Sequence, residues 1–208
     1  MKCLSFNCKG MASASKKLAL HRLFDIEPID MILLQETLGD VDHIYRALLS
    51  LKHGWHFHCL YAMGRSRGLA IGYNPRTIKA LSAWGGSGFI GMDIFSAELG
   101  LNLWIVNIYG PCRQRESFWQ HFLNLSIVSL DHVILGGDLN FSIGFGESWG
   151  SQAQVDSLSG LLMNLLEQHN LANVPMNNPL PTWRNRRVGE AALARRLDRF
   201  LIKESLLN

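Results

Sequence analysis

A chain of 208 residues that is 48% hydrophobic and 18% charged can bury one sizeable core, which excludes a disordered chain. Its formal net charge of +3 permits a nucleic-acid partner without indicating one. No stretch reaches the roughly 18 apolar residues of a membrane span, and the first residues lack the apolar segment of a signal peptide. We therefore expect an intracellular protein, nuclear or cytoplasmic and not secreted, with no membrane association and no obligate protein partner.

Apolar runs typical of strands alternate with segments of helical period along the chain. The first part is predicted to contain, in order, strand 2–8, helix 16–26, strand 31–34 and helix 41–51. Strands are then predicted at 53–61, 68–73, 78–83, 89–97 and 101–109, with a tight hairpin at 98–100. The last part is predicted to contain helix 116–129, strand 132–135, helix 156–169 and strand 196–202. This interleaving predicts a single domain over residues 1–208, with a sheet-based sandwich covered by helices.

Four cysteines occur without any CxxC pair, so we expect reduced thiols rather than a zinc site. His53, His56 and His58 lie in an aromatic, strand-like stretch without an HExxH motif. Packing and surface roles are therefore the favoured interpretation of this histidine cluster.

Polar residues recur where the predicted strands end. They are Asn7, Glu36, Tyr109, Asp138, Asn140 and Asp198. Each of them alone is more often a turn residue, a helix cap or a core residue than a functional one. Their carboxylates nevertheless offer hard oxygen ligands, and the neutral side chains offer hydrogen-bond donors, if the strand ends converge at one edge. Such an inventory suits Mg²⁺-assisted phosphoryl chemistry.

The motifs that contain these residues follow one another in an order that resembles a known protein family. The motifs are Ser-Phe-Asn, Leu-Leu-Gln-Glu-Thr, Asn-Ile-Tyr-Gly-Pro, Gly-Gly-Asp-Leu-Asn and Arg-Leu-Asp-Arg-Phe-Leu, between Leu4 and Ile202. In this order they resemble the endonuclease/exonuclease/phosphatase superfamily. The resemblance implies an α/β (α+β) fold, namely a four-layered sandwich of two packed, mostly antiparallel sheets flanked by helices.

A narrower resemblance lies in three further segments, which cover residues 64–70, 181–185 and 189–201. They are similar to the endonuclease domain of plant LINE-type non-LTR retrotransposons. This similarity implies DNA as the partner and substrate, with Arg67 and Trp183 as substrate-binding residues. Packing is an equally good interpretation of Trp183.

The resemblance also implies a role for each residue in the ordered motifs. Glu36 would bind Mg²⁺, or Mn²⁺ in its place, while Asn7 maintains the geometry of the metal and phosphate. Tyr109 would contact the phosphate. Asp138 would orient or deprotonate the attacking water, with Asn140 hydrogen-bonded beside it. Asp198 would pair with a histidine from a later Ser-Asp-His strand.

No Ser-Asp-His triplet follows Asp198 in the 208 residues. We therefore expect a C-terminally truncated domain that lacks the last strand of the sandwich and has impaired phosphodiesterase activity on DNA. Two alternatives stay open at this point. One is a catalytically inactive retrotransposon remnant with at most weak nucleic-acid binding, and the other is an inositol-phosphate or lipid phosphatase.

Overall fold

The computed structural model describes residues 1–11, 13–61 and 68–207. The chain divides into two compact units. The first comprises Met1–Tyr109 with Leu135–Gly137, and the second comprises Gly110–Ile134 with Asp138–Asn208. The single domain over residues 1–208 stays a prediction.

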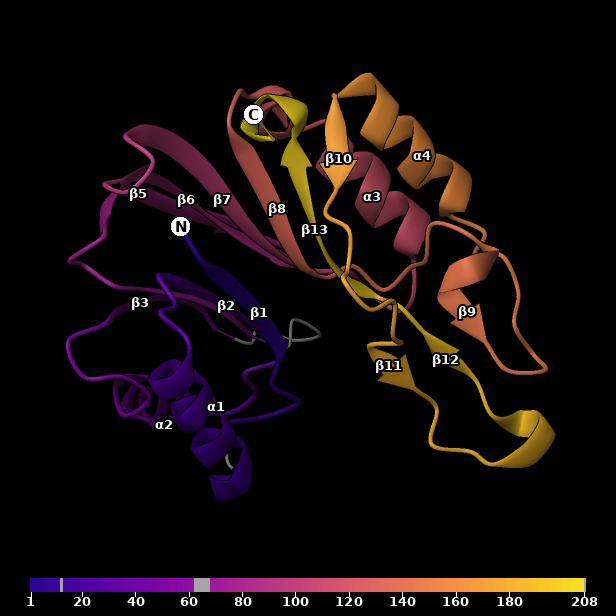
Figure 1. Ribbon diagram of the computed structural model, residues 1–208, viewed down its shortest axis with the longest axis horizontal. Coiled ribbons are helices and arrows are strands. Elements are labelled where there is room, and N and C mark those ends of the chain that lie inside the picture. The colour runs from indigo at the N-terminus through magenta and orange to yellow at the C-terminus, as the bar shows by residue number, and fades with distance from the viewer. Residues whose placement is uncertain (12, 62–67, 208) are drawn as a thin grey trace. The chain divides into compact units, whose positions relative to one another are not determined.

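The first unit contains two sheets and the helices that cover one of them (Figure 1). Its elements are β1 (Cys3–Asn7), α1 (Ala14–Ile26), β2 (Met31–Gln35), α2 (Val41–Leu49), β3 (His56–Leu60), β4 (Leu69–Tyr73), β5 (Ile78–Gly86), β6 (Phe89–Ser96) and β7 (Leu101–Tyr109). One sheet has the strand order β1-β2-β4-β3. The other has the order β5-β6-β7-β8, and of β8 (Val133–Asp138) only Leu135–Gly137 belong to this unit. The pair β1–β2 is parallel, whereas β2–β4, β3–β4, β5–β6 and β6–β7 are antiparallel.

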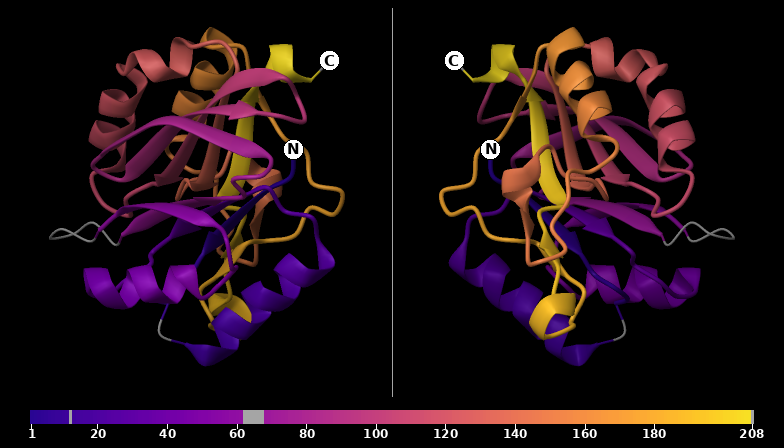
Figure 2. Two further views of the ribbon diagram at one scale, coloured as in Figure 1. Left: turned by 90° about the vertical axis from the view of Figure 1, so that its left-hand side faces the viewer. Right: turned by 90° about the vertical axis from the view of Figure 1, so that its right-hand side faces the viewer.

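The continuous apolar run in β2 fits its position inside the first unit. Met31 to Leu34 have no exposed surface, as expected for a strand covered on both faces. On one face, the helices α1 and α2 pack their apolar sides against the sheet, with Phe24 and Leu48 in the same core cluster as Leu34. Both views in Figure 2 show these two helices on the same side of that sheet. On the other face, β2 and β4 pack against β7.

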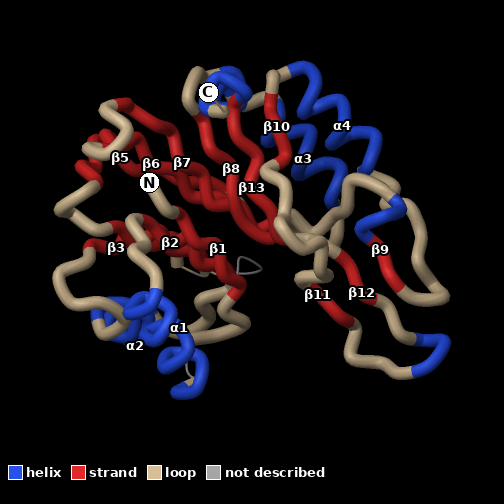
Figure 3. Tube along the Cα trace, viewed as in Figure 1, coloured by secondary structure: helices blue, strands red, loops and turns tan. Residues whose placement is uncertain are grey.

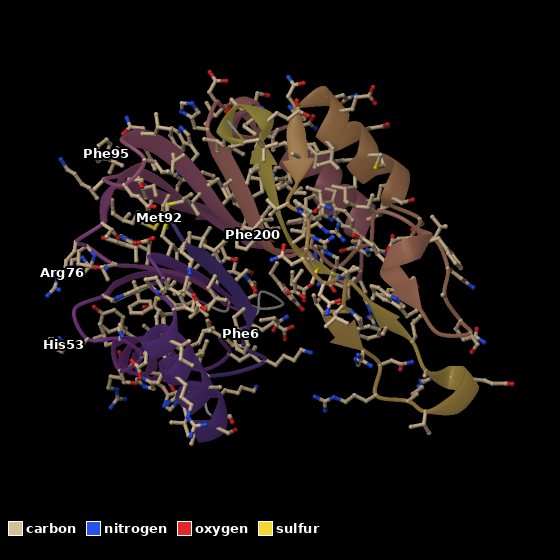
Figure 4. All side chains as sticks on the ribbon, viewed as in Figure 1. Phe6, His53, Arg76, Met92, Phe95 and Phe200 are labelled. Atoms are coloured by element: carbon tan, nitrogen blue, oxygen red, sulfur yellow. The ribbon has the colours of Figure 1, made fainter. Side chains whose placement is uncertain are left out.

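Burial changes along β6 in the second sheet of this unit, because its first four residues are buried and exposure begins only toward its end. Met92 of β6 is fully buried, whereas Phe95, three positions later, is 37% exposed (Figure 4). The predicted hairpin at 98–100 joins β6 to β7, and the Gly100 N–H donates to the Ser96 carbonyl at 2.9 Å.

The second unit has its own helices and a small sheet. Its elements are α3 (Arg115–Leu123), β9 (Ser148–Trp149), α4 (Ser159–Gln168), β10 (Leu171–Asn173), β11 (Trp183–Arg184), β12 (Ala194–Arg195) and β13 (Asp198–Lys203). The strand β13 lies between β10 and β8, and the small sheet has the order β11-β12-β9. Trp119 of α3 packs edge-to-face on Phe141, with ring centroids 4.8 Å apart, and both side chains are buried.

The predicted mixed α/β fold is confirmed, since sheets and helices are interleaved as expected and the pairings are mostly antiparallel. The helix predicted at 116–129 is wrong in its second half, because α3 ends at Leu123 and only the 3-10 helix Ser126–Ser129 follows. Leu125 between them has an extended backbone, with φ −76° and ψ 135°, which interrupts the helix. The short strands β9, β10, β11 and β12 were not predicted, and Figure 3 shows them in red. Within the part of the chain that the structure describes, no helix is long and apolar enough to cross a membrane.

Candidate functional site

The ends of β1 and β2 bring two of the predicted residues together. These strands are parallel neighbours with Asn7 opposite Gln35, so both leave the sheet at the same edge. The pairing continues beyond the strands, where the Gly10 N–H donates to the Glu36 carbonyl at 2.8 Å. At this edge, Asn7 Nδ2 donates a hydrogen bond to Glu36 Oε1 at 2.9 Å. Two motifs that lie 29 positions apart therefore form one polar pair.

The Glu36 backbone adopts a left-handed conformation, with φ of +50°, and its side chain is largely buried. This conformation costs a non-glycine residue on the order of 1 kcal/mol and persists only where the surroundings enforce it. The adjacent loop is fastened by Lys16, whose Nζ donates to the carbonyls of Cys8 at 2.6 Å and Lys9 at 2.9 Å. The Asn7–Glu36 pair therefore lies on a tightly held edge, as a preorganised site requires.

A buried amide pair lies directly behind Glu36. Gln35 Nε2 donates to Asn107 Oδ1 at 2.6 Å, and Asn107 Nδ2 donates to the carbonyls of Leu34 at 2.9 Å and Ala70 at 3.0 Å. Neither amide side chain is exposed. Asn107 thus joins β7 to β2 and β4 through side-chain hydrogen bonds. The sequence offered one signal for this role, because Asn107 is a polar residue among the apolar residues of its strand.

Tyr109 is the last residue of β7, two positions after Asn107. Its backbone N–H donates to the Gly88 carbonyl at 2.8 Å, and its side chain is half-buried. Gly137 allows β7 to approach closely, because a Cβ at this position would overlap the Ile108 carbonyl oxygen. The glycine pair before Asp138 therefore has a packing role beside the strand that ends in Tyr109.

In the second unit, Asp138 and Asn140 lie together at the end of β8. The Asn140 backbone N–H donates to Asp138 Oδ1 at 3.1 Å. The Asn140 side chain points elsewhere, since its Nδ2 donates to the Gly110 carbonyl at 2.5 Å. Asn140 has a φ of +56°, which sets this turn. The expected hydrogen bond between Asp138 and Asn140 is thus present, and it is made by the backbone of Asn140.

Asp198 is the first residue of β13, and the chain before it is bonded to the Asp138 loop. The Leu139 N–H donates to the Leu197 carbonyl at 3.0 Å. Thr182 Oγ1 accepts hydrogen bonds from the N–H groups of Leu197 at 3.0 Å and Asp198 at 3.1 Å. Sequence reasoning assigned no role to Thr182, although it lies in the Pro-Thr-Trp segment beside Trp183. The indole of Trp183 is half-buried, and its residue pairs with Arg195 across β11 and β12.

The thiols near these residues differ in reactivity. Burial raises the pKa of the Cys8 thiol, next to Asn7, to about 12. Cys112 in the second unit is exposed, and its thiol lies 3.7 Å from Asn140 Oδ1. Cys8 is therefore unreactive at neutral pH, whereas Cys112 is accessible to reagents.

The oxygen donors of these residues have to suit any divalent metal ion that binds there. In residues 1–11, 13–61 and 68–207, no group of three or more His, Cys, Asp and Glu is placed to hold a metal ion. Mg²⁺ needs no such group, because it commonly takes one or two carboxylates and completes its octahedron with water and substrate oxygens. The hard carboxylate oxygens of Glu36, on a fixed backbone with the Asn7 amide beside them, fit that chemistry.

The predicted site residues thus form a set in each unit. Asn7, Glu36 and Tyr109 belong to the first unit, and Asp138, Asn140, Asp198 and Trp183 belong to the second. Their convergence in one cleft stays a prediction. Arg67 lies outside the described residues.

The solved structures that are similar to this chain include the three that follow. The endonuclease domain of TRAS1, a telomere-specific non-LTR retrotransposon, is 16% identical with a TM-score of 0.72, over 98% of this chain and 85% of that chain. The AP endonuclease LMAP from Leishmania major is 18% identical with a TM-score of 0.76, over 97% and 78%. The mannosyl-6-phosphatase Bt3783 of Bacteroides thetaiotaomicron is 11% identical with a TM-score of 0.66, over 98% and 85%. At these identities the similarity establishes the fold alone.

Among curated proteins, none matches this chain. The sequence profile of the endonuclease/exonuclease/phosphatase family matches residues 4–208, which is nearly the whole chain. Members of this family are hydrolases, among them nucleases and phosphatases. The chain therefore belongs to the endonuclease/exonuclease/phosphatase family.

Proposed function

We propose that this protein is a Mg²⁺-dependent endonuclease that hydrolyses DNA phosphodiester bonds. The observation that carries the proposal is the hydrogen bond of 2.9 Å between Asn7 and Glu36 at the shared edge of two parallel strands. It holds a carboxylate and an amide from separate motifs side by side. A carboxylate held in this way suits a metal ligand, and the amide beside it suits a donor to a phosphate oxygen.

The roles proposed for the residues follow from their chemistry. Glu36 holds Mg²⁺, or Mn²⁺ in its place, and the bound metal supplies neutralisation of phosphate charge. Asn7 and Tyr109 donate hydrogen bonds to phosphate oxygens. Asp138 orients a water molecule and accepts its proton, and the Asn140 N–H fixes the carboxylate for that task.

Asp198 is the second carboxylate of the proposed mechanism in the second unit. Its backbone N–H donates to Thr182 Oγ1 at 3.1 Å. This hydrogen bond fixes the first residue of β13, which is Asp198 itself. A fixed carboxylate can orient a general acid or base and stabilise its charged form. Trp183 and Arg67 contact the DNA in this proposal.

The DNA substrate is favoured by two observations. The segments at 181–185 and 189–201 are similar in sequence to LINE-type endonucleases, and the TRAS1 endonuclease domain has a similar fold. We therefore propose that the chain derives from a LINE-type non-LTR retrotransposon. An intracellular, nuclear or cytoplasmic location fits such an element.

A plasmid-nicking assay tests this function. Supercoiled plasmid is incubated with the protein in Mg²⁺, in Mn²⁺ and in EDTA, and open-circle product is measured by gel. We expect metal-dependent nicking that Glu36→Gln and Asp138→Asn abolish. The matched control is Glu167→Gln on an exposed position of α4, which should nick as the parent does. Nicking that survives in EDTA or in Glu36→Gln would refute the proposal.

A second candidate function is phosphomonoesterase action on an inositol phosphate or a lipid. It is favoured by the similarity of the fold to a mannosyl-6-phosphatase. Release of inorganic phosphate from inositol polyphosphates and from phosphoinositide vesicles tests it with the same variants. Phosphate release without plasmid nicking would replace the first proposal with this one. DNA binding without either reaction would identify an inactive remnant.

A further inference from the structure

A partly buried carboxylate in the second unit lies between two arginines. Glu147 ends the 3-10 helix Phe145–Glu147 that follows the Asp138 loop. Its Oε2 lies 2.9 Å from Arg199 Nη2, and its Oε1 lies 3.2 Å from Arg199 Nη1 and 3.2 Å from Arg196 Nη1. The Arg199 side chain has no exposed surface, and that of Arg196 is 9% exposed. Two buried cations therefore share one anion.

The same groups bind the backbone on both sides of this cluster. Arg199 Nη2 donates to the carbonyls of Phe141 at 3.2 Å and Arg196 at 3.0 Å. Glu147 Oε2 accepts the N–H of Ile143 at 2.7 Å, and the Glu147 carbonyl accepts the N–H of Arg196 at 3.0 Å. The ion pair thus fastens residues 141–147 to residues 196–199.

One of these segments directly follows the loop of Asp138 and Asn140, and the other contains Asp198. Phe141 directly follows Asn140, and Arg199 directly follows Asp198. Between them, the hydrogen bond of 3.0 Å from Leu139 to Leu197 is a direct backbone link. Without the ion pair, this link and the turn at Asn140 would have to hold the loop against β13.

The charges make the pair interdependent. Burial, together with the neighbouring Arg199, lowers the pKa of Arg196, so the Glu147 charge is needed to keep both guanidiniums in place. Loss of one partner of a buried ion pair leaves an uncompensated charge, which the structure relieves by moving. The nearest parts that can move are the loop at 139–143 and the start of β13.

We propose that Glu147 and Arg199 are positioning residues that hold the loop of Asp138 and Asn140 against the strand that begins with Asp198. Neither residue touches the substrate in this proposal. They act through the backbone of Phe141 and Ile143 on one side and of Arg196 on the other. The effect on catalysis rests on the function proposed above, whereas the effect on the loop does not.

The chain contains a matched control for this ion pair. Asp156 is buried and accepts Arg115 Nη2 at 2.7 and 2.8 Å, with Arg195 Nη1 at 3.7 Å. This second ion pair of the same unit joins α3 to the segment before α4. Among the described residues, its carboxylate contacts Arg115, Arg195 and the N–H of Leu158 and none of residues 139–143, so Asp156→Asn should destabilise the unit without releasing the loop.

The first measurement is independent of activity. Amide hydrogen exchange of Leu139 and Asn140 is followed by NMR in the parent, Glu147→Gln, Glu147→Asp, Arg199→Lys and Asp156→Asn. We expect amide exchange to be about 10-fold faster or more in the Glu147 and Arg199 variants, because the free energy of local opening is lower. Glu147→Asp and Arg199→Lys keep the charge, so they report on positioning even if Glu147→Gln fails to fold. Exchange no faster than in Asp156→Asn would overturn the proposal.

The second measurement is the nicking rate at saturating DNA, with DNA affinity measured separately without Mg²⁺. We expect Glu147→Asp and Arg199→Lys to lower kcat by about 10- to 100-fold with nearly unchanged DNA affinity, because small displacements of reacting groups are costly. Faster exchange with an unchanged kcat would show that the loop position does not matter for catalysis and would overturn that part. A parent chain that does not nick DNA would refute the proposed function, while the exchange data still decide the positioning role.

Discussion

Substitution of Asn107 by alanine should destabilise the first unit far more than a change of one polar side chain usually does. Asn107 is fully buried and makes side-chain hydrogen bonds to Gln35, Leu34 and Ala70 at 2.6, 2.9 and 3.0 Å. Each of these bonds contributes about 1 kcal/mol net, and a buried carbonyl left without its donor costs about 1–3 kcal/mol.

The free-energy change can be bounded from these contacts. Gln35 Nε2 keeps Ser5 Oγ at 3.1 Å and the Leu33 carbonyl at 3.2 Å, so it retains partners after the substitution. The Leu34 and Ala70 carbonyls each lose a donor. The Gln35 bond at about 1 kcal/mol and the two carbonyls at about 1–3 kcal/mol each sum to a loss of about 3–7 kcal/mol in the free energy of unfolding, a size typical of broken buried hydrogen-bond networks.

Equilibrium unfolding in urea, followed by tryptophan fluorescence, measures this loss. The control is Asn102→Ala, the same change on an exposed position of the same strand. It should alter stability by less than about 0.5 kcal/mol. A loss within about 1 kcal/mol of that control would show that the buried amide pair does not hold the strands together. Because Gln35 precedes Glu36, we also expect Asn107→Ala to weaken nicking.

Three further predictions concern single side chains. Ellman's reagent near pH 8 should label Cys112 first, because burial raises the pKa of Cys3 and Cys8 to about 12 and of Cys59 to about 11. A fast phase that remains in Cys112→Ser would disprove this order. Thr182→Val should slow nicking and destabilise the unit by about 1 kcal/mol, because two N–H groups lose their acceptor, whereas Thr182→Ser should behave as the parent. Burial, then Lys203, lowers the pKa of His169 from 6.5, so the unfolded chain takes up its proton first as the pH falls. The contribution of His169 to stability is therefore complete above about pH 6.5 and is lost below it. Between about pH 7 and 5, the melting temperature of His169→Gln should fall less than that of the parent protein. Equal falls in both proteins would contradict this assignment.

The sequence alone predicted the long elements of the fold. Fully apolar runs such as Met31 to Leu34 indicated buried strands, and helical spacing indicated α1, α2 and α4. The turn at 98–100 indicated the hairpin. These features are local, because the pattern of one segment depends on which of its faces is covered. The polar residues at strand ends were visible in the same way.

The partners of those residues were not visible in the sequence. Asn107 bonds to Gln35, 72 positions away, and Arg199 bonds to Glu147, 52 positions away. Nothing in the sequence around Glu147 distinguishes it from an exposed glutamate. The strands of two or three residues, such as β9 and β11, are too short for any periodicity, and they form because a neighbouring strand supplies their hydrogen bonds. Contacts of this kind are selected only when the chain has folded, since a side chain's burial and its charge partner depend on segments that are distant in the sequence.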